Sequence, residues 1–275
     1  MSRAWGFAVV APALALALLG GGCAMNVSET RPAKVLRGGE IQLSEMNDIV
    51  IPTRAVGGLI DGARDAANAA DDRMLTPEER RTLIGAAAAI SLTGPGYGAH
   101  IDVAAGLGYR FDLQARLGNG IYALSLRRGF PLSEKWNLAL GARGAYNSGQ
   151  TFVEYADDVA EWVKLSETRR FDGQLFVQAG PEWGEFARLW FGAKGMLSPL
   201  RTDIDATRIG GTRERVEATI YHAGGFVGAA IGYRWIFFVV ELNVLASYGH
   251  VRAFDENYDL SGYVIAPSYG FMGTF

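Results

Sequence analysis

Three histidines, His100, His222 and His250, are the residues of this chain that could carry acid–base chemistry near neutral pH. A hydrolase or acyltransferase would need one of them within hydrogen-bonding reach of a nucleophile, with a third group to orient the ring. His222 lies among glycines, and no nearby serine stands out as a partner. Gly-x-Ser-x-Gly, His-Glu-x-x-His and glycine-rich phosphate-binding motifs are absent from the sequence. We therefore predict no catalytic residue.

Metal and nucleic-acid binding find no support in the sequence. Asp157 and Asp158 are adjacent, but such a pair in a charged loop is typically only solvated. The single cysteine, Cys23, excludes a disulfide within the chain and a zinc-type cysteine cluster. The formal net charge of −3 and an isoelectric point near 5.7 argue against nucleic-acid binding. No cofactor, metal or nucleic-acid partner is predicted.

Polar or small residues, some of them charged, recur instead at every second position of many short segments. Leu140 and Ala142, for example, alternate with Gly141 and Arg143. Successive side chains of a β-strand point to opposite faces, so one face of each segment is apolar and the other polar. The polar face is predicted to carry a network of mixed sign, formed by Asp102, Arg116, Arg127, Arg143, Asp172, Arg188, Lys194 and Glu241.

The elements that would position these groups are antiparallel strands. Their number is even if both termini of the chain face the periplasmic side of the membrane. Residues 39–46, with Ile41 and Leu43, supply a tenth strand. An alternative leaves residues 39–46 out of the barrel and joins residues 101–117 into one strand, which gives eight. We predict an all-β, antiparallel transmembrane barrel of ten strands, and the other nine lie near residues 98–108, 111–117, 120–129, 136–147, 171–181, 187–198, 218–233, 236–249 and 262–275.

Alternation alone fits either a soluble sheet with an apolar interior or a membrane barrel with an apolar exterior. Aromatic residues begin or end several apolar stripes, as with Trp136 and Tyr146, which is typical of membrane interfaces. Short connections also alternate with longer, charged ones over residues 148–169, 200–216 and 251–260. Both features favour the membrane barrel. A soluble, lipocalin-like lipoprotein with its apolar stripe inward stays as the alternative fold.

The end of the chain strengthens this interpretation. Apolar residues alternate up to the final residue, and Tyr269, Phe271 and Phe275 resemble the terminal strand of bacterial outer-membrane β-barrel proteins. The resemblance covers residues 98–275 as a general class and identifies no particular member. It implies that the barrel-assembly machinery reads this strand during biogenesis and that outer-membrane lipids surround the protein.

The beginning of the chain indicates export. Residues 1–22 have the basic start, the apolar run and the small residues of a signal peptide. The stretch ending in Cys23 resembles the lipobox of bacterial lipoproteins, although Gly20 stands where that motif has leucine, so cleavage without acylation stays open. The resemblance implies a lipidated Cys23 and, with Ala24 following, delivery to the outer membrane of a Gram-negative bacterium.

Residues 23–97 are expected to form a lipid-anchored N-terminal segment before the barrel of residues 98–275. Within it, Thr76-Pro77-Glu78-Glu79 predicts the start of a helix, and an earlier helix is predicted over residues 56–70. In the ten-strand arrangement these helices form an inserted loop or plug. In the eight-strand arrangement they form a periplasmic extension.

Three functions stay open. The first is a structural, anchoring or surface-interaction role, the second a small-solute or lipid transporter or channel, and the third a membrane-embedded lipid hydrolase or acyltransferase. A barrel of this size is narrow enough for side chains to fill, and buried charges are tolerated only when paired. We therefore expect a plugged lumen, in which Arg143 and Arg188 pair with Asp172 or Glu241.

Overall fold

The structure is a computed structural model that describes residues 25–54, 56–57, 95–118, 120–149, 164–165, 168–205, 213–253 and 256–275. The predicted signal peptide, Cys23 and the helix predicted to start at Thr76 lie outside the described residues. So does the helix predicted over residues 56–70, apart from its first two residues.

Strands account for most of the described chain, and their alternating sequences agree with this. The strands are β1 (Ile41–Pro52), β2 (Gly96–Gly108), β3 (Phe111–Gly118), β4 (Ile121–Pro131), β5 (Trp136–Gly149), β6 (Lys164–Leu165), β7 (Thr168–Trp183), β8 (Ala187–Asp205), β9 (Arg213–Tyr233), β10 (Ile236–Tyr248), β11 (His250–Ala253), β12 (Glu256–Asp259) and β13 (Gly262–Thr274).

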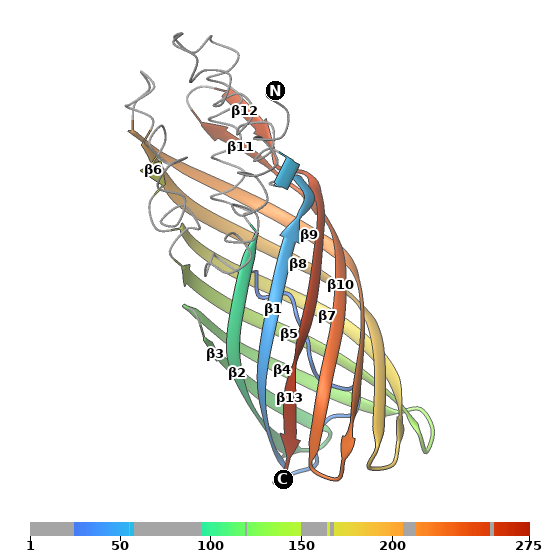
Figure 1. Cartoon of the computed structure of the whole chain (residues 1–275). Helices are drawn as coiled ribbons and strands as arrows, with labels where there is room; N and C mark the ends of the chain where they lie inside the picture. Colours follow the sequence, from blue (N-terminus) through green and yellow to red (C-terminus); the bar gives the residue numbers. More distant parts are fainter. Residues whose placement is uncertain are drawn as a thin grey trace, which may run out of the picture.

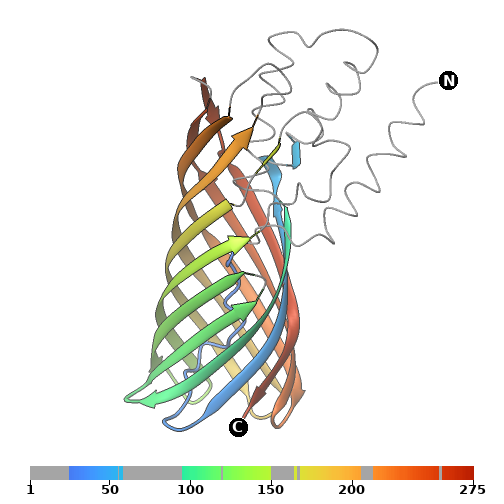
Figure 2. The same ribbon diagram turned by 90° about the vertical axis from the view of Figure 1, so that its left-hand side faces the viewer.

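Ten of these strands form a closed antiparallel barrel (Figures 1 and 2). The order around the wall is β1-β2-β3-β4-β5-β7-β8-β9-β10-β13, and β13 pairs again with β1. The closing strands are joined at their ends because Ile41 and Phe275 exchange backbone hydrogen bonds of 2.9 and 2.8 Å. The ten-strand prediction is therefore confirmed, and the barrel includes β1 in addition to residues 98–275.

The eight-strand alternative is wrong because residues 101–117 fold as two strands. β2 and β3 pair with each other, with Asp102 opposite Arg116. The turn between them holds Tyr109 and Arg110 with positive φ angles of 49° and 64°. Two successive residues with positive φ angles form a type I′-like hairpin turn, whose twist matches that of the adjoining strands.

The apolar face points outward. Burial alternates residue by residue along β10, where Phe238, Val240 and Leu242 are exposed by 46%, 43% and 42% while Val239 between them is fully buried. An exposed apolar surface on every wall strand fits lipid, so the soluble alternative with an inward apolar stripe is wrong. Among the described residues, no helix is long and apolar enough to cross a membrane.

The two ends of the barrel differ. The turns at residues 109–110, 132–135, 184–186 and 234–235 share one end with the carboxyl terminus (Figure 1). The longer connections share the other end, called here the long-connection end. Two connections predicted as loops contain strand there. Much of residues 200–216 belongs to β8 and β9, which stay paired up to Asp205 and Arg213. Within residues 251–260, β11 and β12 form a hairpin. Main-chain pairing simply continues beyond the apolar part of these strands.

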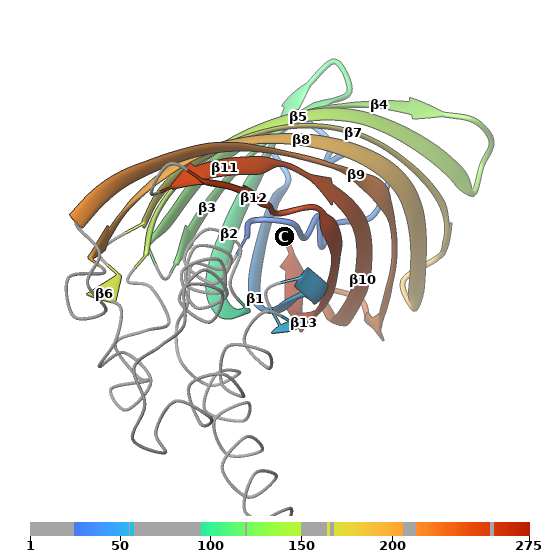
Figure 3. The same ribbon diagram turned by 90° about the horizontal axis from the view of Figure 1, so that it is seen from above.

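Residues 25–40, called here the luminal segment, pass through the inside of the barrel (Figures 1, 2 and 3). Met25 packs with Val50 and Ile121 in the half with the long connections. The segment then reaches the other end, where Gly39 donates a hydrogen bond to the carbonyl of Gly106. A Cβ at Gly106 would lie 1.8 Å from the Arg37 carbonyl oxygen, so only glycine permits this approach.

Pairing of β1 with β13 can be tested by cross-linking. Ile51 lies opposite Ile265, at a Cα separation of about 4.5–5.5 Å, which suits a disulfide. In a Cys23→Ser background, the Ile51→Cys/Ile265→Cys variant should oxidise to a cross-linked form with altered mobility on a non-reducing gel. The Ile51→Cys/Tyr263→Cys variant, out of register by two residues, is the control. Equal cross-linking in both, or in neither, would contradict the closure.

Candidate functional site in the barrel lumen

Seven of the eight charged residues of the predicted network point into the lumen and are at most 5% exposed. Arg188 lies at the rim near the carboxyl terminus, with 15% of its side chain exposed. These residues stand on seven different wall strands, which brings together positions far apart in the chain. The seven are Asp102, Arg116, Arg127, Arg143, Asp172, Lys194 and Glu241.

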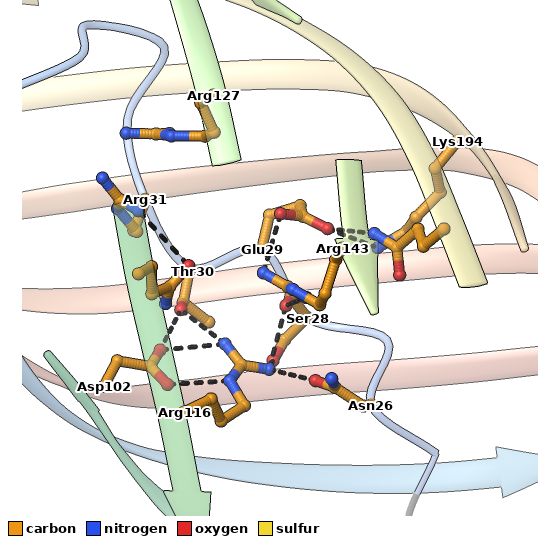
Figure 4. Close-up of polar contacts among 12 residues, drawn as sticks. Asn26, Ser28, Glu29, Thr30, Arg31, Asp102, Arg116, Arg127, Arg143 and Lys194 are labelled. Carbon is orange, nitrogen blue, oxygen red and sulfur yellow. Dashed lines mark hydrogen bonds and ion pairs between the residues drawn. The ribbon is translucent and has the colours of Figure 1, made fainter. Parts of the chain in front are cut away.

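Asp102 and Arg116 form the first contact between the wall and the luminal segment (Figure 4). The Arg116 guanidinium donates to both carboxylate oxygens of Asp102, at 2.7 and 2.9 Å. Its remaining hydrogens reach the segment, with bonds to Asn26 Oδ1 at 2.6 Å and to the Ser28 carbonyl at 3.1 Å. The planar guanidinium thus bridges a wall carboxylate and the segment.

Glu29 carries the negative charge of the segment into a basic part of the wall (Figure 4). Arg143 donates to its carboxylate at 2.9 Å and to the Ser28 carbonyl at 2.7 Å. Gln174 also donates to the Glu29 carboxylate, and the Lys194 ammonium lies 4.0 Å from it. Lys194 donates in addition to the carbonyl of Val27. Glu29 is therefore the counter-ion of two wall cations.

Glu241 holds the main chain of the luminal segment at Glu29 and Thr30. Its two carboxylate oxygens accept hydrogen bonds of 2.7 Å from the backbone N–H groups of Glu29 and Thr30. The Trp190 indole and the Asn243 amide donate to it at 2.9 and 3.0 Å. A buried carboxylate with several donors is stable without a paired cation, so Glu241 acts as a clamp for the segment.

Asp112 anchors the part of the segment closer to the carboxyl-terminal end. Arg127 donates to both of its oxygens, at 3.0 and 2.8 Å, and Arg31 approaches to 2.6 Å. The backbone N–H of Leu36 adds a third partner at 3.1 Å. Arg127 also donates to the Pro32 carbonyl at 2.9 Å. Asp112 therefore has two cationic partners, Arg127 from the wall and Arg31 from the luminal segment.

The predicted pairing of Arg143 and Arg188 with Asp172 or Glu241 is wrong. Arg143 pairs with Glu29, while Arg188 lies 3.9 Å from Glu182 and stacks on the Phe237 ring at 4.2 Å. Asp172 accepts from Arg170 at 2.6 Å and from Ser198 at 2.5 Å. The prediction failed because it treated the wall as pairing with itself, whereas the segment provides several of the partners.

Large apolar side chains fill the lumen beside this network. Trp190, Phe176 and Phe226 point inward and are at most 5% exposed. A glycine makes room for each of them. A Cβ at Gly228 would lie 2.2 Å from Trp190, and a Cβ at Gly141 would lie 2.2 Å from Phe176. The lumen is therefore packed rather than open, as expected of a narrow barrel.

One contact revises the prediction about histidines. Nδ1 of His222 lies 2.6 Å from the Ser247 hydroxyl, because the two residues stand opposite each other on β9 and β10. Both side chains are buried, and His222 Nε2 has no hydrogen-bonding partner among the described residues. A nucleophile needs a base that is itself oriented by a third group. Among the described residues no such third group bonds to the His222 ring, so the described part of the chain shows a histidine–serine pair and not a triad.

Within the described part of the chain, the buried charges are balanced. Six basic side chains and six acidic ones are buried, and no group of three or more potential metal ligands occurs among the described residues. Such an interior holds a chain segment firmly. The buried acids are Glu29, Asp48, Asp102, Asp112, Asp172 and Glu241, and the bases are Arg31, Arg116, Arg127, Arg143, Arg170 and Lys194.

Sequence reasoning missed Glu29 and Arg31. They lie between the predicted signal and the first predicted strand, in a stretch with no strand or helix period. Their only signal is that both charges are close together in a short segment directly before a strand. Arg170 was also missed because the predicted strand over residues 171–181 began at residue 171, whereas β7 begins at Thr168.

Comparisons with known proteins identify no family for this chain. No protein-family model matches the chain, and no curated protein matches it significantly. Similar solved structures include Ail, the attachment invasion locus protein of Yersinia pestis, with 11% identity, a TM-score of 0.32 and coverage of 86% of this chain and 99% of Ail. Another is the outer membrane protein OprG from Pseudomonas aeruginosa, with 9% identity, a TM-score of 0.37 and coverage of 88% and 98%.

A third is Neisserial surface protein A, with 8% identity, a TM-score of 0.31 and coverage of 86% of this chain and 96% of that protein. Similarity at this level transfers no function. The description of this chain as a ten-stranded transmembrane barrel rests on its own strand pairing and on its outward apolar face.

The central role of Glu29 gives a stability prediction. Glu29→Gln keeps the side-chain shape but leaves Arg143 and Lys194 without their counter-ion, and breaking a buried pair costs about 3–5 kcal/mol. We expect unfolding in urea, followed by loss of the folded band on an unboiled gel, to shift to clearly lower urea.

Lys34→Gln is the matched control because its 2.9 Å ion pair with Glu182 is at the rim, with 45% of the Lys34 side chain exposed. Exposed pairs contribute about 0–1 kcal/mol. A shift of the same size in both variants would show that Glu29 has no special place in the interior.

Proposed function

We propose that this chain is a Gram-negative outer-membrane barrel with a closed lumen, whose role is structural or surface-binding rather than transport or catalysis. The luminal segment is the observation that supports this most. Every residue from Met25 to Ala33 is buried, and its backbone and side chains bond to groups on at least seven wall strands.

A conducting pore would need a continuous path of water along the lumen. Arg116, Arg127 and Arg143 instead extend from the wall and bond to backbone carbonyls of the segment at 3.1, 2.9 and 2.7 Å. Inward Trp190 and Phe176 occupy the space beside them. These contacts favour a plugged barrel, whose contacts with other molecules take place on its outside.

The long-connection end offers a charged surface for such contacts. Arg213 and Arg215 lie 3.6 and 3.1 Å from Asp203 where β8 and β9 extend beyond the apolar band. At the end of the β11–β12 hairpin, hydrogen bonds from the hydroxyl and the backbone N–H of Ser261 lower the pKa of Asp259. This keeps its carboxylate charged over a wider pH range.

A gated pathway is the second candidate, and one observation favours it. The contacts of the luminal segment are mostly polar, as in the bonds from Gln178 to the Arg31 and Pro32 carbonyls at 3.2 and 3.0 Å. Water can replace polar contacts at lower cost than apolar ones. A segment held in this way could leave the lumen under a force applied from one side.

Single-channel recording in planar bilayers tests the proposal. The intact protein should give no steady current. A variant lacking residues 26–36, or the Glu29→Ala/Arg31→Ala variant if the deletion fails to fold, should conduct because the central contacts are lost. Steady current through the intact protein would contradict the closed lumen.

A cross-link separates the two candidates. Val35 contacts the position that a Cβ at Gly129 would occupy, so Val35→Cys/Gly129→Cys in a Cys23→Ser background should lock the segment to the wall. If a voltage step opens the intact protein and the oxidised variant stays silent until reduced, the gated pathway is correct. Silence of both at every voltage supports the plug.

Lipidation at Cys23 is a further part of the proposal. Met25, two residues later, is fully buried inside the barrel. Because two residues span at most about 7 Å, the proposed acyl group would be attached within that distance of Met25. Cells grown with labelled palmitate should label the protein, and Cys23→Ser should lose the label without losing its heat-modifiable mobility. Labelling that survives the substitution would exclude the anchor.

The last strand carries the proposed assembly signal. It consists of Tyr269, Phe271 and Phe275, which are 42%, 57% and 66% exposed and are proposed to be read by the assembly machinery.

A further inference from the structure

A pocket of about 460 Å³ lies on the outer wall near the long-connection end, across β5, β7, β8 and β9. It is lined by Tyr146, Arg169, Arg170, Phe171, Pro199, Leu200, Arg201 and Glu217. Tyr146 and Phe171 stand opposite each other and are exposed by 41% and 54%. They belong to the aromatic residues that border the apolar band, so the pocket lies where the membrane interface is expected.

The charges of this pocket favour an anion. Arg169 and Arg201 are direct cross-strand partners on β7 and β8, and like charges in that arrangement are destabilising. Glu217, opposite Arg201 on β9, lies 3.7 Å from it and is the one carboxylate among the described residues that line the pocket. Since Arg170 is buried, the exposed side chains of the described lining thus carry two guanidinium groups and one carboxylate. Guanidinium groups bind phosphate through parallel hydrogen bonds.

A second pocket of about 420 Å³ lies next to the first, toward the middle of the apolar band. Gly144 and Gly173 are paired across β5 and β7, two residues from Tyr146 and Phe171 respectively, so the rows are about 7 Å apart. A Cβ on Gly173 would meet nothing within 4 Å, and one on Gly144 only Phe171 at 3.9 Å. The outward side chains around this hollow are apolar, including Leu113, Leu124 and Leu175.

The two pockets together have the polarity of a lipid. A basic pocket lies at the membrane interface, a pair of aromatic rings separates it from an apolar hollow, and the hollow lies within the band that faces acyl chains. We propose that this face of β5, β7 and β8 binds a lipid with a phosphate in its headgroup, from the leaflet at the long-connection end. Arg169 and Arg201 hold the phosphate, and one acyl chain lies over Gly144 and Gly173.

This inference concerns the outer wall and does not depend on whether the lumen conducts. Native mass spectrometry of the detergent-solubilised full-length protein can measure it, with dimyristoyl phosphatidic acid as the probe. Dimyristoyl glycerol provides the chains without the phosphate, and glycerol 3-phosphate provides the phosphate without the chains. We expect phosphatidic acid to bind at least tenfold more tightly than either.

Arg169→Gln/Arg201→Gln should weaken phosphatidic acid binding about tenfold or more, because charge-assisted bonds to the phosphate are lost. Gly144→Leu/Gly173→Leu should also weaken it by filling the hollow, and the open space at both positions permits the change. Matched controls are Arg213→Gln, an outward arginine outside the pocket lining, and Gly195→Leu, where the nearest atom to a Cβ is 3.9 Å away. Both controls should bind as the parent does.

Salt supplies a test that needs no substitution. Raising the salt concentration should weaken binding of phosphatidic acid and leave binding of dimyristoyl glycerol unchanged. Equal binding of glycerol 3-phosphate and phosphatidic acid would reveal a site for a free anion and would overturn the lipid proposal. Unchanged binding in either double variant would overturn it as well.

Discussion

Charged side chains that face a narrow, packed lumen must find partners there, and the interior of this barrel is organised by that requirement. Water solvates an exposed arginine at little cost, but a guanidinium inside the barrel needs an acceptor for each N–H group. Arg116, Arg127 and Arg143 meet this need only in part from the wall. The luminal segment supplies the rest through Glu29 and its own backbone carbonyls. The luminal segment and the wall therefore complete each other's hydrogen bonding. The contacts that neutralise the buried charges are also the contacts that fill the lumen.

The outer face of the barrel is suited to lipid rather than to a polar interior. Apolar side chains point away from the lumen on every wall strand, and aromatic residues such as Trp136 and Tyr146 lie toward opposite ends of this apolar surface. Glycine serves both faces in different ways. Gly228 and Gly141 admit inward aromatic rings that fill the interior, whereas Gly144 and Gly173 leave a hollow on the outside. The alternation of side chains along the strands thus produces a packed polar interior and an apolar outer surface. The hollow at Gly144 and Gly173 is the place on that surface where we propose that a lipid binds.

Much of the fold could be predicted because its signals are local. A period of two places Asp102 and Glu241 inward wherever the strand lies in the wall, and strand starts such as 111, 136, 187 and 236 agree with the structure. The partners could not be predicted in the same way. Glu29 and Arg143 are 114 residues apart, and His222 and Ser247 are 25 residues apart. Their contact depends on strand register and on the path of a segment that has no period of its own.

The sequence by itself determined the class of protein. Alternating apolar residues and an aromatic-rich last strand predict a membrane barrel with charges inside, because side-chain direction in a strand follows from backbone geometry alone. Only the tertiary structure decided which charges meet. It placed residues 25–40 in the lumen, paired Glu29 with Arg143 rather than Arg143 with Asp172, and set Arg169 against Arg201 above a hollow. The physical reason is that pairing energies depend on distances across the closed wall, and closure is a property of the whole chain.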